Sequence, residues 1–464
     1  MPAETELLNR HAMVGLAIGV IRDGRLEFHG HGFADLGSRT PVTEDTVFRV
    51  GSLTKTIIAI AISQLCERKL VELDAPAGEY LRAFRLVPAT AAPTVRQLLT
   101  HTAGLPELVH PSHAFAPVLG QTVPFGHRVP TLAEFYGGGL RLVTEPGTTH
   151  TYSNHGFATL GQIIEDSTGQ PLDAYFRDHI FTPLGMGHTD LVRSGRVTSR
   201  LATGYALRAT GPHPVADRDL VTVGAGGVYS TTADMARYVT ALLEGSPVIP
   251  EPGRMFAPQY QPDPRLPGVG LAFFRRDFGG HPVVEHEGLM PGFNSWLTVA
   301  PDDGVGIVAF TNGARGAHAW LGAEVSALLR HFLGVPEPAL RTDLPQRPEV
   351  WTKLCGWYSF RGSPRDVQKW FIAGAQVFVR RGRLTLRPLT PIPALARGLA
   401  LHPDDDEDPG VFRVDLSAVG LGTSRVVFGD DAFHVEFTPM SFDKRRRPIR
   451  GRIPRRSRTS RRAG

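Results

Sequence analysis

Strand-like segments lie at both ends of residues 1–335, and helix-like segments lie between them. Residues 13–35 contain two apolar runs joined by the turn Arg22-Asp23-Gly24, which predicts a β-hairpin, and β-rich runs return between 281 and 311. Between these ends, the apolar run 56–67 lacks glycine and proline and predicts a buried helix. Segments so far apart in sequence can share one sheet only if the helical middle is an insertion beside it. We therefore expect one sheet of distant strands with a helical insertion.

The remaining residues divide into three parts by composition. Four prolines between 336 and 349 indicate a linker, and 350–443 alternates apolar and polar residues between regular turns, which predicts a small all-β domain. Residues 444–464 contain Lys444 and ten arginines and no acid. This tail carries +11, so that the other 443 residues carry −6 although the whole chain carries +5. We expect the tail to be disordered, with a non-specific anionic partner, nucleic acid or lipid, as one alternative and no partner as the other.

Composition excludes several classes of protein. With 42% apolar and 20% charged residues among 464, the chain can bury a large core. It has no run of about 18 apolar residues for a membrane helix, and the opening 1–6 lacks the pattern of a secretory signal. Cys66 and Cys355 are too few for a disulfide scaffold or a cysteine-built zinc site. We expect a cytoplasmic protein with no membrane span, no cofactor and no metal; the oligomeric state is not predicted.

The tetrapeptide Ser52-Leu53-Thr54-Lys55 stands at the start of the predicted buried helix. A serine hydroxyl becomes a nucleophile when a base removes its proton, and a lysine three residues later lies on the same helix face. The helix N-terminus adds unpaired N–H groups and a positive dipole. Lysine can be this base only if burial and neighbouring positive charge lower its pKa by several units from about 10.4. Taken alone, the motif is equally compatible with a chance match.

Two further segments follow in order, Tyr152-Ser153-Asn154 and His286-Glu287-Gly288. Together with Ser52–Lys55, this series resembles the serine β-lactamase and penicillin-binding-protein superfamily. The tyrosine form is similar to class C β-lactamases, D-alanyl-D-alanine carboxypeptidases, D-aminopeptidases and the family's esterases. The resemblance covers about 13–335 and implies a mixed α/β (α+β) fold with an antiparallel sheet, flanking helices and an all-helical insertion. Residues 350–443 resemble the lipocalin-like domains appended to some members.

The resemblance also implies roles for individual residues. Ser52 would attack a carbonyl group and form an acyl-enzyme, while Lys55 and Tyr152 would share the proton transfers. Which of these two is the principal base stays open, since Tyr152 could act as base only if nearby Lys55 favoured its anion. Asn154 would orient Lys55 and the acyl side of the substrate.

The strand triplet is implied to line the substrate site. The backbone N–H groups of Ser52 and Leu289 would form the oxyanion hole, and His286 and Gly288 would contact the substrate. The best-known β-lactamases have lysine at the position of His286. Histidine, with a pKa near 6.5, is mostly neutral at pH 7 and would donate a hydrogen bond instead of carrying a positive charge. This difference weakens the β-lactamase interpretation.

The sequence therefore predicts a serine hydrolase that acts on a small-molecule ester, D-aminoacyl or β-lactam substrate. Carboxylesterase is the first choice, D-amino-acid peptidase or DD-carboxypeptidase the second, and β-lactamase the third. The alternative of another class is a non-catalytic binding protein of penicillin-binding type. The intact set of Ser52, Lys55, Tyr152 and Asn154 argues against it, because a binder does not need groups for proton transfer.

Overall fold

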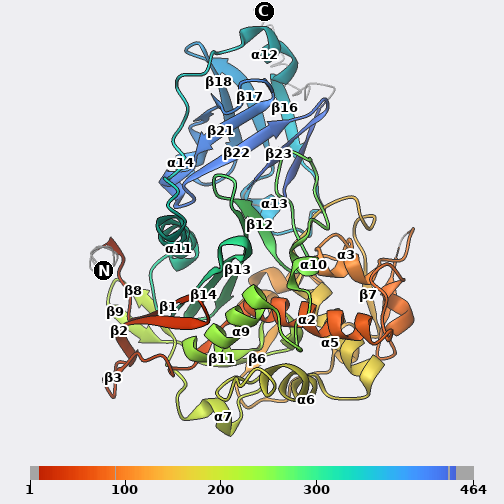
Figure 1. Ribbon diagram of the computed structural model, residues 1–464. Coiled ribbons are helices and arrows are strands. Elements are labelled where there is room, and N and C mark those ends of the chain that lie inside the picture. Colours follow the sequence, from red (N-terminus) through yellow and green to blue (C-terminus); the bar gives the residue numbers. More distant parts are fainter. Residues whose placement is uncertain (1–9, 89, 437–438, 446–464) are drawn as a thin grey trace, which may run out of the picture.

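The computed structural model describes residues 10–88, 90–436 and 439–445, and Figure 1 shows their arrangement. Its central sheet has seven strands in the order β12-β13-β14-β15-β1-β2-β3, with antiparallel neighbours. The strands are β1 (Gly15–Arg22), β2 (Arg25–Asp35), β3 (Thr40–Pro41), β12 (Phe274–Asp277), β13 (Pro282–Met290), β14 (Phe293–Ala300) and β15 (Val305–Thr311). Strand β1 pairs directly with β15, which confirms the prediction of one sheet from distant segments.

Helices cover both faces of this sheet. Helix α9 (Thr232–Glu244) packs on one face and α11 (Ala317–Leu333) on the other. Strand alternation explains this division, because neighbouring residues of a strand point to opposite faces. In β1, for example, Ala17 and Ile21 join the apolar cluster on the α9 side, whereas Leu16 and Val20 join the cluster on the α11 side.

The insertion between β3 and β12 contains most of the helices, and one of them is buried along most of its length. Helix α2 (Thr54–Glu67) follows the 3₁₀ turn η1 (Gly51–Leu53) and is buried along most of its length, as its run of isoleucine and alanine predicts. The other helices of the insertion that matter for the site are α3 (Val95–Leu99), α5 (Asn154–Thr168) and α8 (Val223–Gly226). Short two-stranded ladders also occur here, so the insertion is not purely helical.

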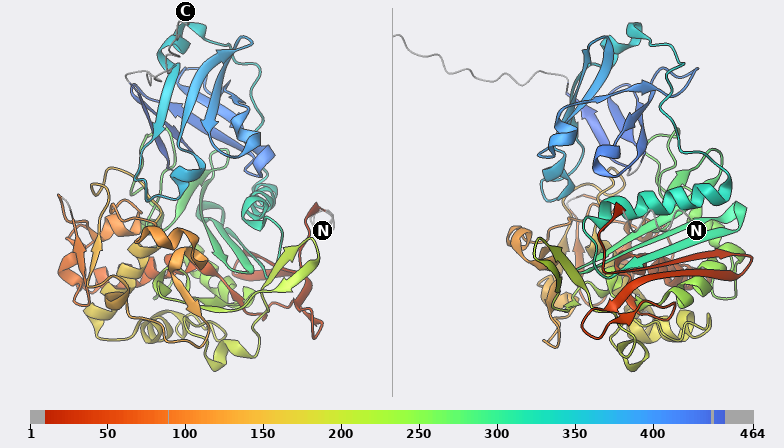
Figure 2. Two further views of the ribbon diagram at one scale, coloured as in Figure 1. Left: turned by 180° about the vertical axis from the view of Figure 1, so that it is seen from behind. Right: turned by 90° about the vertical axis from the view of Figure 1, so that its left-hand side faces the viewer.

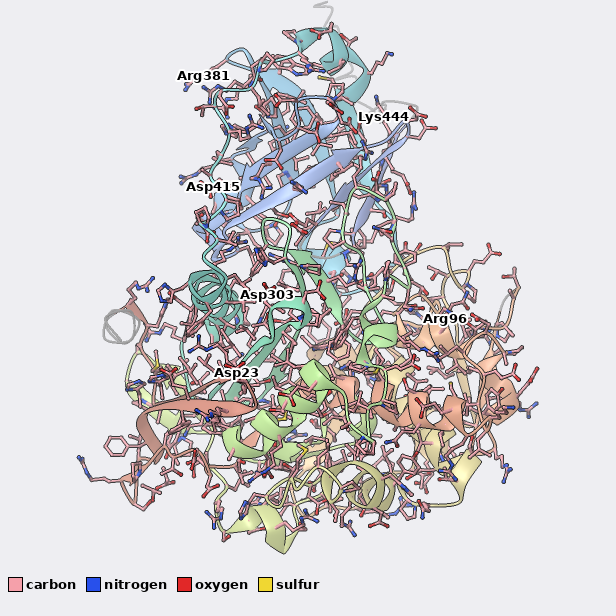
Figure 3. All side chains as sticks on the ribbon, in the orientation of Figure 1. Asp23, Arg96, Asp303, Arg381, Asp415 and Lys444 are labelled. Carbon is pink, nitrogen blue, oxygen red and sulfur yellow. The ribbon has the colours of Figure 1, made fainter. Side chains whose placement is uncertain are left out.

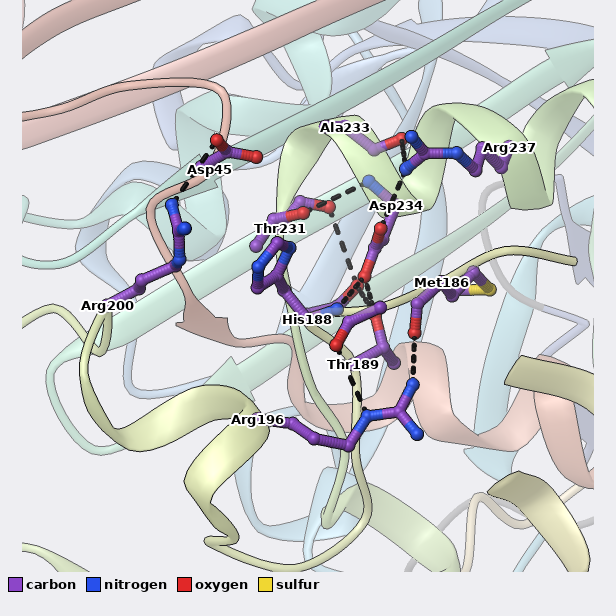
Figure 4. Close-up of polar contacts among 12 residues, drawn as sticks. Asp45, Met186, His188, Thr189, Arg196, Arg200, Thr231, Ala233, Asp234 and Arg237 are labelled. Carbon is purple, nitrogen blue, oxygen red and sulfur yellow. Dashed lines mark hydrogen bonds and ion pairs between the residues drawn. The ribbon is translucent and has the colours of Figure 1, made fainter. Parts of the chain in front are cut away.

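A buried aspartate of α9 fixes the segment that contains His188 and Thr189 to this helix. Asp234 accepts hydrogen bonds from the backbone N–H of His188 (2.7 Å), the hydroxyl of Thr189 (2.8 Å) and the guanidinium of Arg237 (2.8 Å), as Figure 4 shows. Its own backbone N–H is bound by the N-cap side chain of Thr231 (3.0 Å). Because Asp234 is 1% exposed, these donors compensate for the burial of a carboxylate.

The C-terminal residues form a second, nine-stranded antiparallel sheet in the order β19-β18-β17-β16-β24-β23-β22-β21-β20. Its strands are β16 (Gly356–Phe360), β17 (Gly374–Arg380), β18 (Arg383–Leu389), β19 (Leu399–Ala400), β20 (His402–Pro403), β21 (Val411–Asp415), β22 (Thr423–Phe428), β23 (Ala432–Val435) and β24 (Ser441–Lys444). The two ends of this order, β19 and β20, follow each other in the chain, so the sheet curls almost to closure around an apolar core. We call this part the β unit.

The ends of the β unit differ slightly from the expected limits. It is preceded by α12 (Pro348–Leu354), and no helix or strand lies between Leu333 and Pro348 in the described chain, where we expect a linker. Lys444, which we placed in the tail, is the last residue of β24 and pairs with Tyr358. Residues 446–464 of the expected tail lie outside the described residues.

The β unit sits above the edge of the central sheet that carries β12 and β13, next to α11 (Figures 1 and 2). Arg265 joins the two parts, since it contacts the Asp408 carboxylate (2.6 Å) and the Phe428 carbonyl (3.0 Å). The outer surface of the β unit carries charged side chains, such as Arg381 and Asp415, in Figure 3. None of the helices among the described residues is long and apolar enough to cross a membrane.

Candidate active site

The buried side chain of Lys55 is the centre of the site. Its Nζ lies 2.9 Å from Ser52 Oγ and donates hydrogen bonds to Asn154 Oδ1 (2.8 Å) and the Ala225 carbonyl (2.7 Å). Ser52 lies in η1 and Lys55 in the first turn of α2, which explains how a three-residue spacing brings them together. Burial lowers the pKa of Lys55 well below its ordinary value, with Glu287 acting in the opposite direction. A neutral amine so placed can take the hydroxyl proton of Ser52.

Tyr152 lies beside the same pair. The Nζ of Lys55 is 4.8 Å from the centre of its ring, and its hydroxyl hydrogen-bonds to Ser52. Burial raises the pKa of Tyr152 above its ordinary value, and this effect outweighs the opposing hydrogen bond. Lys55 therefore does not produce a resting tyrosinate. The structure instead places a neutral phenol next to Ser52, where it can donate a proton.

Asn154, the first residue of α5, joins Lys55 to a residue that the sequence analysis missed. Its Nδ2 donates to Gln121 Oε1 (3.0 Å), which also accepts the hydroxyl of Thr222 (3.0 Å). Gln121 is 0% exposed. Because two donors converge on its oxygen, Gln121 fixes which end of the Asn154 amide faces Lys55. No motif surrounds Gln121 in the sequence, so nothing there could have marked it.

Two glycines allow strand β13 to approach the turn η1, which carries Ser52. A side chain at Gly288 would place Cβ 2.1 Å from the Val50 carbonyl oxygen, and one at Gly51 would place it 2.8 Å from the Leu289 nitrogen. Gly51 also has a φ of +54°, which favours glycine. The glycine of the strand triplet thus serves close packing of β13 against residues 50–51.

The backbone of Leu289 faces the turn that contains Ser52. The two-residue turn Pro291-Gly292 closes the β13–β14 hairpin at the pair Met290 and Phe293. Hydrogen-bonded and non-hydrogen-bonded pairs alternate in an antiparallel ladder, so the Leu289 N–H points away from β14. It therefore points to the edge of β13 that β12 leaves unpaired beyond Glu285, where Gly51 and Ser52 lie. This is the arrangement expected for two converging N–H groups of an oxyanion hole.

His286 is neutral, as expected, but its hydrogen bonding differs from the expectation. Its Nδ1 lies 2.6 Å from the Glu287 carbonyl oxygen, which can only accept, so Nδ1 carries the proton. Burial, together with the nearby Lys55, lowers the pKa of His286 to about 3. Nε2 is then an acceptor, and no partner for it is found among the described residues. The imidazole therefore has no free N–H for a substrate carboxylate, because its Nδ1–H already donates to the Glu287 carbonyl.

His101 holds the tyrosine segment in place. Its Nδ1 accepts the backbone N–H of Ser153 (3.1 Å), its carbonyl accepts that of Thr151 (2.8 Å), and its ring lies 4.3 Å from that of Tyr152. Its φ of +57° is unusual for a residue with a side chain. Through these contacts His101 fixes the loop that carries Tyr152.

A cleft of about 660 Å³ opens in front of Ser52, and we call it the Ser52 cleft. Tyr152, Asn154 and Leu289 line it, as does Gln368 from the β unit. The loop before Gln368 also docks beside the cleft, since the Val367 N–H donates to Glu107 (3.0 Å). The β unit therefore contributes to the wall of the cleft. In the described part of the chain, no group of three or more histidine, cysteine or acidic side chains is placed to hold a metal ion.

Comparisons with known proteins agree with this geometry. The family model described as Beta-lactamase matches residues 3–332. Penicillin-binding protein 4 of Amycolatopsis lactamdurans is 29% identical over 379 residues, which cover 77% of this chain and 96% of that protein. Unguisins hydrolase ungD' of Aspergillus campestris is 28% identical over 413 residues, which cover 84% of this chain and 71% of that protein.

The β unit also has a counterpart among solved structures. The octameric penicillin-binding protein homologue from Pyrococcus abyssi superposes with a TM-score of 0.62 and 24% identity, over 96% of this chain and 99% of that one. At this identity the likeness shows the fold, and its coverage includes the β unit. The family match spans more than half of the chain, and the relatives include hydrolases. The chain therefore belongs to the beta-lactamase family and is a serine hydrolase of the β-lactamase and penicillin-binding-protein type.

Proposed function

We propose that the protein hydrolyses carboxylic esters through an acyl-enzyme on Ser52. The observation that carries this proposal is the triple hydrogen bonding of buried Lys55. A neutral lysine has two N–H groups and one lone pair. Asn154 Oδ1 and the Ala225 carbonyl can only accept, so they take the two N–H groups, and the lone pair is left for the hydroxyl proton of Ser52.

In acylation, Lys55 takes the Ser52 proton while Oγ attacks the ester carbonyl carbon. The carbonyl oxygen becomes an oxyanion, which the N–H groups of Ser52 and Leu289 stabilise. The C–O bond to the alcohol then breaks, and Tyr152 gives its phenolic proton to the departing oxygen. The Lys55 ammonium returns a proton to the Tyr152 phenolate, so both groups regain their resting states.

Deacylation uses the same groups in reverse. A water molecule attacks the acyl carbon and loses a proton to Lys55, directly or through Tyr152. The oxyanion forms again beside the same N–H groups, and Ser52 Oγ leaves with a proton from Lys55. The products are a carboxylic acid and the free enzyme.

D-aminoacyl amides are the second candidate substrate class, and β-lactams the third. The order follows from the cleft, where no described arginine or lysine side chain lines the walls to bind the carboxylate of a β-lactam. The proton on His286 Nδ1 is directed to the Glu287 carbonyl, so His286 does not replace such a cation. Amide cleavage needs the same acylation chemistry with an amine as the leaving group, and Tyr152 can protonate it.

The test is the time course of p-nitrophenyl butyrate hydrolysis by the wild-type protein and the Ser52→Ala variant. We expect steady release of p-nitrophenol from the wild type, a butyryl adduct on Ser52 by mass spectrometry after rapid quenching, and neither from the variant. Equal turnover by folded Ser52→Ala protein would overturn the proposal. A stable adduct without turnover would instead identify a binding protein that acylates but does not hydrolyse.

A further inference from the structure

The charges along the Ser52 cleft are of one sign. The described residues that line it include two acidic side chains, Glu107 and Glu287, and no arginine or lysine. The buried amine of Lys55 does not balance these two acids in the resting state, because burial keeps its pKa low. A substrate in this cleft therefore meets two carboxyl groups and no permanent cation.

Glu287 is the more accessible of the two. It is the middle residue of the His286–Gly288 triplet, and strand alternation points it to the side of β13 opposite to His286. Its carboxyl group is accessible to solvent, and no hydrogen bond or ion pair to it is found within the described residues. Burial, together with the neighbouring Glu285, raises the pKa of Glu287 to about 7, although Lys55 acts in the opposite direction. The absence of a bound partner leaves this carboxyl group available to a cationic ligand.

The two arginines that share a cavity with Glu287 already have carboxylate partners. They line an adjoining cavity of about 400 Å³ that Glu287 also borders. Arg276 lies 3.6 Å from Glu285, and Arg330 lies 3.7 Å from Glu337. Neither pairs with Glu287, so the local positive charge is already balanced by other acids.

Glu107 supplies the second carboxyl group from a different segment. Its Oε2 accepts the Val367 N–H of the β unit at 3.0 Å, which fixes the side chain at the wall of the cleft. Burial, together with the nearby Asp366, raises the pKa of Glu107 to about 7. Glu107 and Glu287 both raise the pKa of Tyr152 further, in addition to the larger effect of burial.

We propose that the Ser52 cleft selects substrates whose acyl part carries an ammonium or alkylammonium group and discriminates against those that carry a carboxylate, with Glu287 and Glu107 as the specificity-determining residues. This inference rests on the proposed acyl-enzyme function of Ser52. An ammonium group gains a partner that the protein itself does not provide, whereas a carboxylate meets like charge and no free donor on His286. The substrate class is thus a cationic acyl compound, such as an ester or amide of an amino acid with a free amino group.

The experiment compares three esters with the same leaving group and nearly the same shape. They are p-nitrophenyl 4-(trimethylammonio)butanoate, its neutral isostere p-nitrophenyl 5,5-dimethylhexanoate, and p-nitrophenyl hydrogen glutarate. The measured quantity is kcat/KM at pH 8, where carboxyl groups with a pKa near 7 are mostly ionised. Ratios between substrates are compared, since they cancel any general loss of activity in a variant.

We expect Glu287→Gln to lower the ratio of cationic to neutral ester roughly fivefold and to raise the ratio of anionic to neutral ester by a similar factor, as for one partly exposed ion pair. Glu287→Lys should shift both ratios further in the same directions, and Glu107→Gln should shift them in the same sense as Glu287→Gln. The control is Glu67→Gln. Glu67 is an exposed acid at the end of α2 outside the cleft, so its loss changes the net charge equally and should leave both ratios unchanged.

The outcomes separate the two proposals. If Ser52→Ala hydrolyses the three esters as fast as the wild type, the proposed function fails. If hydrolysis depends on Ser52 but both ratios stay the same in Glu287→Gln and Glu287→Lys, only the charge selection is wrong. Thermal unfolding of each variant shows that it is folded, and equal shifts in Glu67→Gln would show an effect of net charge alone and also overturn the inference.

Discussion

Gln121 is expected to fix the orientation of the Asn154 amide, although Gln121 itself does not touch the reacting atoms. In Gln121→Leu, the Asn154 Nδ2 loses its acceptor at 3.0 Å and the Thr222 hydroxyl loses the same oxygen. Leaving one buried N–H unsatisfied costs about 1–3 kcal/mol. If the Asn154 amide turns to recover a partner, its Oδ1 no longer faces Lys55, and kcat should fall by roughly 5- to 150-fold when that energy is lost from the transition state.

A pH profile distinguishes this positioning role from a simple loss of stability. The Asn154 oxygen stabilises the charged form of Lys55, so its loss should lower the pKa of Lys55 further and move the acid limb of kcat/KM to lower pH. The Gln121→Glu variant keeps an acceptor at the same place and should restore most of kcat. If Gln121→Leu keeps kcat within about twofold of the wild type, or loses kcat without a shift of the acid limb, the reasoning is wrong.

Three further outcomes follow from the structure. Gly51→Ala should reduce kcat roughly a hundredfold, because its Cβ would lie 2.8 Å from the Leu289 nitrogen; steady-state kinetics beside a melting curve test this. Since the pKa of Lys55 is lowered and that of Tyr152 is raised, kcat/KM should rise as Lys55 loses its proton and then stay level into the alkaline range. Lys55→Arg should abolish turnover at every pH. Glu107→Gln should be more stable than the wild type at pH 8 by about 1–3 kcal/mol, because the pKa of Glu107 is near 7 in the folded state and lower in the unfolded state. The difference should vanish near pH 4, where Glu107 is mostly protonated in both states. Urea unfolding at the two pH values measures it.

The parts of the site that the sequence predicts are those set by local spacing. Ser52 and Lys55 are three residues apart at a helix start, so their contact follows from helix geometry once the apolar run is recognised. The sheet of distant strands follows in the same way from the alternation of strand-like and helix-like segments, because exposed strand edges need partners. Tyr152 and Asn154 needed the family resemblance, since nothing local says that a segment almost a hundred residues later returns to Lys55.

The parts that the sequence did not predict are set by tertiary contacts. Gln121 lies in a short irregular segment without periodicity, and only the packing of α5 and α8 brings Asn154 and Thr222 to its oxygen. The proton position on His286 depends on the distance to one backbone carbonyl, which no residue type reveals. The same is true of Glu107, whose place in the cleft depends on contact with the β unit.

The contact between Glu107 and the β unit gives that unit a part in the chemistry. The loop of the β unit places the Val367 N–H on one carboxyl oxygen of Glu107 and Gln368 in the wall of the Ser52 cleft. The Val367 N–H favours the ionised form of Glu107, but burial and Asp366 of the same loop outweigh it and raise the pKa of Glu107 to about 7, so the charge at the wall changes near neutral pH. Displacement of this loop would remove that hydrogen bond and expose Glu107 to water, which would weaken its pull on a cationic substrate, because an ion pair in water is worth less than one in a partly enclosed cleft. The acyl-transfer groups thus belong to the first 335 residues, whereas the charge selectivity that we propose depends on both parts of the chain.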